Sequence, residues 1–234
     1  GSAAVLQLDM KEAANIVKAE NRRVAKIIGI NQAARTTCVK PAGTTSLVLG
    51  TSSGIHAWHN KYYIRRMRVG KNEPIYSYLS KNHPELIQDE YFRPHDTAVI
   101  EIPQAAPKGS IVRTESAFDL LERVKKVATE WVATGHKTGS NTHNVSATIS
   151  LKEKDWEPAG EWMWKNRNTY NGLSVLPYDG GTYTQAPFED ITKAKYDEMT
   201  KTLQEIDLTK VIEDTDNTDL SGELACAGGS CEIT

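Results

Sequence analysis

A tight Pro/Gly turn dominates the early part of the chain, because it must join two different kinds of backbone. Residues 35–40 are predicted as a strand, and the turn reads Pro41-Ala42-Gly43-Thr44-Thr45-Ser46. The apolar residues 47–49 then begin a helix and are expected to be buried. N–H groups at a helix start have no partner within the helix and favour anions. Gly43 would let a ligand oxygen approach the backbone, and the three hydroxyls can donate. The turn therefore predicts a phosphate site, with an ordinary capped strand–helix join as the alternative.

Strands and helices alternate over most of the chain, which predicts an α/β fold with parallel strand pairs. The first helix should be capped by Asp9, with Glu12 completing a capping-box pattern and Gly29 ending it. Its apolar face consists of Ala13, Ile16, Val17, Val24, Ile27 and Ile28. The further predicted helices are 74–80, 84–88, 114–132, 155–166 and 191–203; the further strands are 62–69, 98–102 (ended by Pro103), 145–151 and 173–176.

Composition limits the class of protein. With 39% hydrophobic and 25% charged residues the chain can bury a core and stay soluble, and its net charge of -2 gives no bulk attraction to nucleic acid or an anionic membrane. No run resembles a membrane span or a signal peptide. Three cysteines are too few for a secreted disulfide scaffold, so we expect a cytoplasmic protein. Gly1-Ser2 is typical of an expression remnant, residues 3–204 should be folded, and the acidic tail 205–234 should be mobile.

Two further groups of side chains leave their roles open. His56 and His59 lie in a loop of small residues, but a metal site needs three or four ligands, so metal binding is the weaker interpretation. Arg66 and Arg68 share one face of the predicted strand 62–69, the face expected to be wet. They could bind phosphate or pair with carboxylates, since arginine suits both.

Cys226 and Cys231 flank Ala-Gly-Gly-Ser in the polar tail. Nothing nearby in the sequence could bury them, and two ligands are too few for zinc. An exposed cytosolic dithiol is usually redox-active. The tail therefore predicts a tethered carrier that exchanges disulfides within a site and withdraws to be reduced.

Taken together, four segments resemble the C-terminal part of the catalytic subunit of a ribonucleotide reductase. Val39 to Ser46 is similar to the substrate-phosphate loop of that family, and Ser52 to His56 with Tyr62 to Arg66 is similar to the segment after it. Gly172 to Gly181 with Gln185 to Glu189 resembles a late segment of the monomeric, adenosylcobalamin-dependent class. Cys226 and Cys231 match the tail pair that re-reduces the active site.

The resemblance implies a fold and a chemistry. The family fold is a ten-stranded α/β barrel, of which residues 3–204 would be the C-terminal part. The family removes the 2′-hydroxyl of a ribonucleotide through a thiyl radical, and the tail pair is recharged by thioredoxin or a relative. The phosphate loop would hold a ribonucleoside di- or triphosphate.

The departures from the family limit what the chain could do alone. The family loop often has serine where Ala42 stands, so backbone, Thr44 or Thr45 must supply that donor. The radical cysteine and the active-site dithiol lie upstream in the family. Cys38 matches none of these cysteines and is interpreted as a structural strand residue. The resemblance thus implies an incomplete enzyme, such as a split-gene product, an intein-separated half or a truncated form, that needs the N-terminal portion of the reductase and is inactive without it.

The cofactor follows from a further comparison with the family. In the class that imports its radical from a second subunit, two adjacent tyrosines relay it through this region. Residues 144–149 contain no such pair, and Tyr62-Tyr63 falls in another segment. This favours adenosylcobalamin. The alternatives are a stand-alone nucleotide-binding or regulatory module, and a thiol-redox adaptor unrelated to nucleotides, which the phosphate loop argues against.

Overall fold

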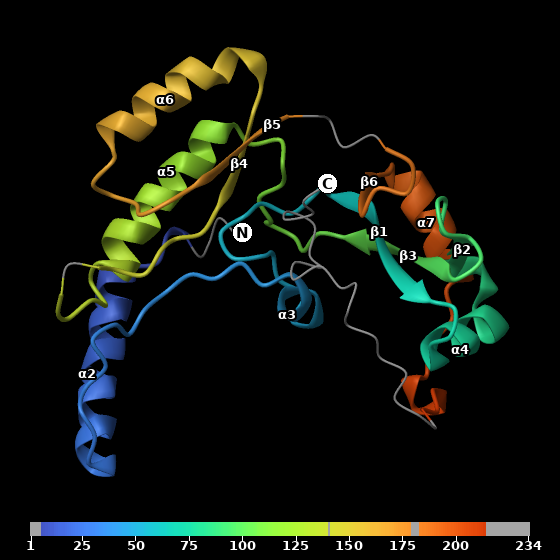
Figure 1. Ribbon diagram of the computed structural model, residues 1–234, viewed down its shortest axis with the longest axis horizontal. Helices are drawn as coiled ribbons and strands as arrows, with labels where there is room; N and C mark the ends of the chain where they lie inside the picture. Colours follow the sequence, from blue (N-terminus) through green and yellow to red (C-terminus); the bar gives the residue numbers. More distant parts are fainter. Residues whose placement is uncertain (1–5, 140, 179–182, 214–234) are drawn as a thin grey trace. The chain divides into compact units, whose positions relative to one another are not determined.

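The computed structural model describes residues 6–139, 141–178 and 183–213, which fall into two compact units (Figure 1). The first unit runs up to Trp58 and resumes over Lys108–Tyr178. The second consists of His59–Pro107 and the described residues after Tyr178. Each unit has its own cluster of buried hydrophobic residues. Helices and strands mix in both, which confirms the predicted α/β class.

The first unit packs helices against a parallel strand pair (Figure 1). In the pair, Ile149 lies opposite Val175, which confirms the predicted parallel pairing in this unit. Leu121, Val124, Ile149 and Leu151 are at most 1% exposed and form the centre of the core. The elements are α2 (Met10–Ile28), α3 (Gly43–Val48), α5 (Ala117–Val127), the π-helical η2 (Ala128–Val132), β4 (Thr148–Leu151), the 3-10 helix η3 (Glu153–Asp155), α6 (Trp156–Lys165) and β5 (Ser174–Pro177).

The helix starts follow from local capping. Asp9 Oδ1 accepts the Glu12 N–H at 2.9 Å, and Gly29 ends α2 with a φ of 75°, both as predicted. Ser116 and Asp119 form a reciprocal capping box at the start of α5. This box explains why the helix begins at Ala117 and not at Thr114.

The predicted packing face of α2 is wrong. Its buried residues are Ala14 and Ala25, whereas Ile16, Ile27 and Ile28 are 59–68% exposed. Small side chains let α2 lie close against η2, so the unit buries the alanine side of the helix and leaves the branched side chains uncovered.

The second unit is built on a four-stranded sheet in the order β2-β3-β1-β6, and every pair in it is antiparallel. The expectation of parallel pairs is therefore wrong here. Residues 90–96 connect β2 to β3, and so short a link permits only an antiparallel turn. The elements are β1 (Tyr62–Gly70), α4 (Pro74–Asn82), the 3-10 helix η1 (Pro84–Leu86), β2 (Ile87–Asp89), β3 (Thr97–Ala105), β6 (Phe188–Asp190), α7 (Lys193–Thr202) and the 3-10 helix η4 (Leu208–Lys210).

Two local predictions in this unit also fail. The helix expected over 84–88 is only the short η1, after which Ile87 pairs with Ile100 in the sheet. Pro103 does not end its strand. The Ala106 N–H donates to Lys61 O, so the alternating ladder leaves the Ile64–Pro103 pair without hydrogen bonds. The nitrogen of Pro103 then points to the other edge of β3. There β2 pairs only as far as Ile100, so the missing N–H of the proline removes no hydrogen bond of the sheet.

The strand predicted over residues 35–40 does not form. We call residues 34–39 the strap. They make only isolated bridges, Arg35 to His136 and Val39 to Val145. The strap is instead held by hydrogen bonds to the end of η2 and the turn after it. The Thr36 N–H and hydroxyl both donate to Gly135 O, at 3.1 and 2.9 Å.

Arg66 and Arg68 pair with carboxylates, which was one of the two kinds of partner that the sequence left open. The Arg66 guanidinium binds Glu101 and Glu189 and also donates to Ala186 O at 3.1 Å. Burial works to lower the pKa of Arg66, but the hydrogen bonds to Glu189 and Glu101 outweigh it and raise the pKa. Arg68 pairs with Glu90 at 3.4 Å. The arginine face of β1 is not uniformly wet, since the side chain of Arg66 is only 9% exposed.

The described residues contain six strands, so the ten-stranded barrel stays a proposal for a longer protein. Among these residues, none of the helices combines the length and the apolar character needed to cross a bilayer.

Replacing Gly135 with alanine should destabilise the first unit. A Cβ atom at Gly135 would lie 1.9 Å from Thr37 Oγ1, and Thr37 is buried with its hydroxyl bonded to Trp131 O at 2.8 Å. We expect the free energy of unfolding to fall by about 1–3 kcal/mol in urea denaturation. The control is Gly160→Ala in α6, because a Cβ atom at Gly160 would have no contact within 4 Å. That variant should be neutral or gain about 0.5–1 kcal/mol. Equal stability of the two variants would contradict the close approach.

Replacing Arg66 with methionine should destabilise the second unit, because Glu101, whose side chain is only 10% exposed, would lose its cation. Breaking one partner of a buried pair costs about 3–5 kcal/mol. Arg23→Met is the matched control, since the Arg23–Glu20 pair is 61% and 55% exposed and solvent screens it, so its loss should have little effect on stability. Chemical denaturation would measure both, and a loss no larger for R66M than for R23M would count against the buried pair.

Candidate functional site

The predicted phosphate turn folds as a bend that leads directly into α3. This helix begins at Gly43 and has six residues, of which none is charged. The Ser46 N–H donates to Ala42 O at 3.2 Å, and Ser46 is buried, while Pro41 and Ala42 are half-buried and Thr45 is exposed. The side chain of Thr44 lies outside the described residues. What the turn can offer an anion is therefore the N–H groups of its first helical turn and the Thr45 hydroxyl.

The residues after the turn are not buried as expected. Val48 is 81% and Leu49 68% exposed, and the side chain of Leu47 lies outside the described part of the chain. The chain reverses at Gly50, which has a φ of 60°, and the Thr51 N–H returns to Ser46 O at 2.9 Å. This early reversal keeps α3 too short to carry an apolar face into the core.

Gly54 brings two of the predicted segments together. It has a φ of 55°, and a Cβ atom there would lie 3.3 Å from the Cα atom and 3.4 Å from the nitrogen of Pro41. The backbone of the 52–56 loop thus lies directly against the start of the phosphate turn. Only glycine combines this backbone conformation with this approach.

His56 holds the 52–56 loop to β4. Its Nδ1 lies 2.9 Å from Ser53 O, and its Nε2 accepts the Thr148 N–H at 3.0 Å. Since Nε2 accepts, the proton must lie on Nδ1, which donates to Ser53. Burial is the largest cause that lowers the pKa of His56, with the positive charges of Arg113 and Arg123 adding to it. A neutral ring with both nitrogens engaged is a structural contact, and the described residues contain no cluster of His, Cys, Asp or Glu that could hold a metal.

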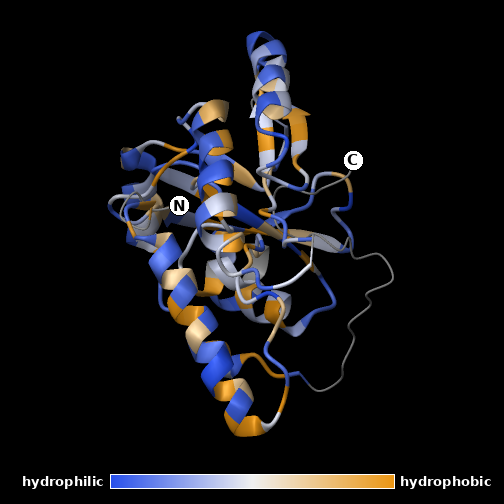
Figure 2. Ribbon diagram, turned by 90° about the vertical axis from the view of Figure 1, so that its left-hand side faces the viewer, coloured by the Kyte–Doolittle hydropathy of each residue, from blue (hydrophilic) through white to orange (hydrophobic). Residues whose placement is uncertain are grey.

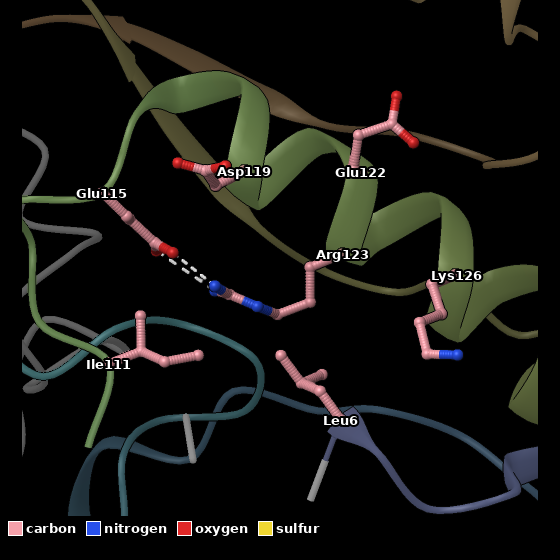
Figure 3. Close-up of a pocket in the computed structure, with 7 residues that line it drawn as sticks. All are labelled: Leu6, Ile111, Glu115, Asp119, Glu122, Arg123 and Lys126. Carbon is pink, nitrogen blue, oxygen red and sulfur yellow. Dashed lines mark hydrogen bonds and ion pairs between the residues drawn. The ribbon is translucent and has the colours of Figure 1, made fainter. Parts of the chain in front are cut away.

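Arg123 is a site residue that the sequence reasoning missed. It lies on α5, donates to Ile55 O at 2.9 Å and forms an ion pair with Glu115 (Figure 3). Its side chain is only 5% exposed. The available signal was an arginine within the apolar pattern of the 114–132 helix. Arg123 and His56 therefore fix the same loop from two sides.

The cavity beside this ion pair is not a second phosphate site. Glu115, Asp119 and Glu122 line it together with two cations, Arg123 and Lys126 (Figure 3). Three carboxylates against two cations disfavour an anion. The Arg123 guanidinium is already committed to Glu115 and Ile55 O.

In the second unit, two more predicted segments lie side by side. β1 pairs with β6, Arg65 lies opposite Phe188, and the Arg66 N–H donates to Pro187 O at 2.8 Å. His59 Nε2 lies 2.9 Å from Asp190 Oδ1, and the His59 ring stacks on Phe188. His59 thus belongs to this sheet edge.

The predicted cysteine sites have different outcomes. Cys226 and Cys231 lie outside the described residues, as does part of the segment Gly172 to Gly181. Cys38 is exposed and belongs to no strand, so its interpretation as a structural strand residue is wrong. Its carbonyl, and not its thiol, makes the structural contact, by accepting the Trp131 Nε1–H at 3.1 Å.

No model of a protein family matches the chain. Curated relatives do. An adenosylcobalamin-dependent ribonucleoside-triphosphate reductase of Lactobacillus acidophilus is 29% identical over 210 residues, which cover 88% of this chain and 27% of the relative. Proteins with the same name from Lactobacillus delbrueckii subsp. bulgaricus (27% identical, 93% and 29% covered) and Euglena gracilis (29% identical, 84% and 26% covered) also match.

A solved structure agrees with these relatives in fold. The crystal structure of a B12-dependent (class II) ribonucleotide reductase superposes with a TM-score of 0.65 at 23% identity, over 82% of this chain and 27% of that one. The chain spans less than a third of the length of each of these four proteins. The predicted resemblance is thus confirmed: over most of its length, this chain is similar to part of the adenosylcobalamin-dependent ribonucleoside-triphosphate reductases and shares the class II reductase fold.

Proposed function

We propose that this chain is part of an adenosylcobalamin-dependent ribonucleotide reductase, and that the complete enzyme converts ribonucleoside triphosphates to deoxyribonucleotides by thiyl-radical chemistry. The observation that carries the proposal is that 84–93% of the chain matches relatives with this one activity in their names. The chain would be the C-terminal portion of a ten-stranded barrel, and would need the rest of the reductase for turnover.

The turn at residues 41–46 would hold the substrate's phosphates. Its N–H groups are neutral donors fixed in direction by α3, so they would bind phosphate oxygens without a counter-charge of their own. The contact of Gly54 with Pro41 supports this role because it sets the position of the turn. Small displacements of a positioning element lower rates strongly, so a rigid turn suits a reaction that must present one sugar carbon to a radical.

The tail dithiol would restore the active site after each turnover. A thiolate of Cys226 or Cys231 would attack the disulfide left in the active site, and exchange would return two thiols there while the tail pair becomes a disulfide. A thioredoxin-like dithiol would then reduce the tail and be oxidised in turn. The Ala-Gly-Gly-Ser between the two cysteines would permit the turn that this pair needs to close.

Adenosylcobalamin, named in the relatives, would supply the radical of the complete enzyme. No group of three or more His, Cys, Asp or Glu side chains within the described ranges is placed to hold a metal, and we assign no residue of this chain to the cofactor's cobalt.

Gly54→Ala should impair substrate binding by the complemented enzyme. Gly50→Ala is the matched control, because Gly50 has nearly the same φ, 60°, but no atom within 4 Å of a Cβ there. Both variants carry the strain of a left-handed alanine, and only G54A also pushes against Pro41. We expect the KM for a ribonucleoside triphosphate to rise about tenfold more in G54A than in G50A. Equal KM values would show that the contact does not position the phosphate turn.

Mixing the chain with the remaining portion of the reductase should produce deoxynucleotides only when adenosylcobalamin is present.

In the same mixture, Cys226→Ser and Cys231→Ser should each stop the thioredoxin-driven reaction after about one turnover and leave the reaction driven by a small dithiol intact. Cys38→Ser is the control and should turn over normally. Full thioredoxin-driven activity of both tail variants would refute the carrier role. Nucleotide binding by the chain alone, with no activity in the mixture, would favour the stand-alone module.

A further inference from the structure

The side of α2 that carries its large apolar residues is uncovered in the described part of the first unit. Ile16, Ile27 and Ile28 are 59–68% exposed, and Val17 and Val24 are 36–37% exposed. In Figure 2 the hydrophobic colour recurs in bands along this helix. Exposure of large apolar side chains to water is unfavourable, and their clustering on one helix marks a contact surface.

The periodicity of α2 separates this surface from the side that its own unit covers. Ile16 and Ile27 are eleven residues apart, which is about three turns at 3.6 residues per turn, so both point the same way. The covered side is the stripe of Ala14, Lys18, Asn21 and Ala25, which repeats with the same helical spacing. It packs toward η2, and Asn21 accepts the Ala33 N–H at 3.0 Å. At about 100° per residue, Ile16 and Ile27 lie roughly opposite the alanine stripe, and Val17, Val24 and Ile28 lie between the two. A second body can therefore pack on the isoleucines while the alanine stripe stays in place.

We infer that this apolar surface of α2 is the docking site for the remaining portion of the reductase polypeptide. This inference rests on the proposed function and names the surface it would use. The relatives carry more than two thirds of their length outside the region that this chain matches, so a large body of protein must contact this region in them. Glu20 and Arg23 follow Ile16 by four and seven residues, so their exposed ion pair lies between Ile16 and Ile27 on the same side of the helix. Apolar side chains mixed with a few charged ones suit a protein interface.

The test measures binding between the full chain and the remaining reductase portion from the same organism, produced as a separate polypeptide. The variant is Ile16→Glu with Ile27→Glu, which places two carboxylates on the apolar surface. Its control is Asn15→Glu with Arg22→Gln. Both control positions are exposed on a side of α2 away from the apolar residues, and the change in charge is the same. Circular dichroism and thermal denaturation establish that each variant is folded, and titration calorimetry gives the Kd.

We expect the Kd of I16E/I27E to rise at least tenfold and that of the control to stay within about twofold of the unsubstituted chain. Equal Kd values for the two variants, or no binding by the unsubstituted chain, would overturn the inference. A homodimer that I16E/I27E dissociates without weakening the complex would also overturn it, because the surface would then serve a second copy. Complex formation without deoxynucleotide production would instead refute the proposed function and leave the docking surface standing.

Discussion

The attachment of the strap to the end of η2 is the constraint on which the candidate site depends. Thr36 and Thr37 donate to carbonyls of Gly135 and Trp131, and the Trp131 indole returns a hydrogen bond to Cys38 O. Carbonyls near a helix end have spare acceptor capacity, and here the threonine hydroxyls add to the backbone N–H groups that these carbonyls already accept. Gly135 allows this, since any side chain there would occupy the place of the Thr37 hydroxyl. The attached strap thus sets the position of Pro41, which is the first residue of the predicted phosphate turn.

The 52–56 loop is positioned by buried polar contacts and not by secondary structure. His56 reaches β4, Arg123 reaches Ile55 O, and Gly54 lies on Pro41. Buried polar groups are tolerated when they are hydrogen-bonded, and in return they specify one arrangement of the backbone. The loop and the start of the turn are thus held against each other within the first unit, as a phosphate-positioning site would require.

Two observations support the proposed docking of further protein on α2: its isoleucines are exposed, and the chain matches only a short part of longer relatives. An amphipathic pattern predicts that one face of a helix is buried, but it does not identify the part of the protein that covers this face. Here the unit uses the alanine side, and the branched residues are left exposed.

The sequence by itself determined the local features and the family resemblance. Asp9 and Gly29 set the boundaries of α2 through a hydrogen bond and through backbone freedom, and the alternation in residues 62–69 set β1. The reductase motifs were also readable, because each is a short run of residues. Tertiary structure alone decided the rest. Strand direction in the second unit depended on the 90–96 turn, and the choice of carboxylates by Arg66 depended on strands distant in sequence. The roles of Gly135, Gly54 and Arg123 depend on atoms 13 to 98 residues away along the chain, and no local pattern encodes such an approach.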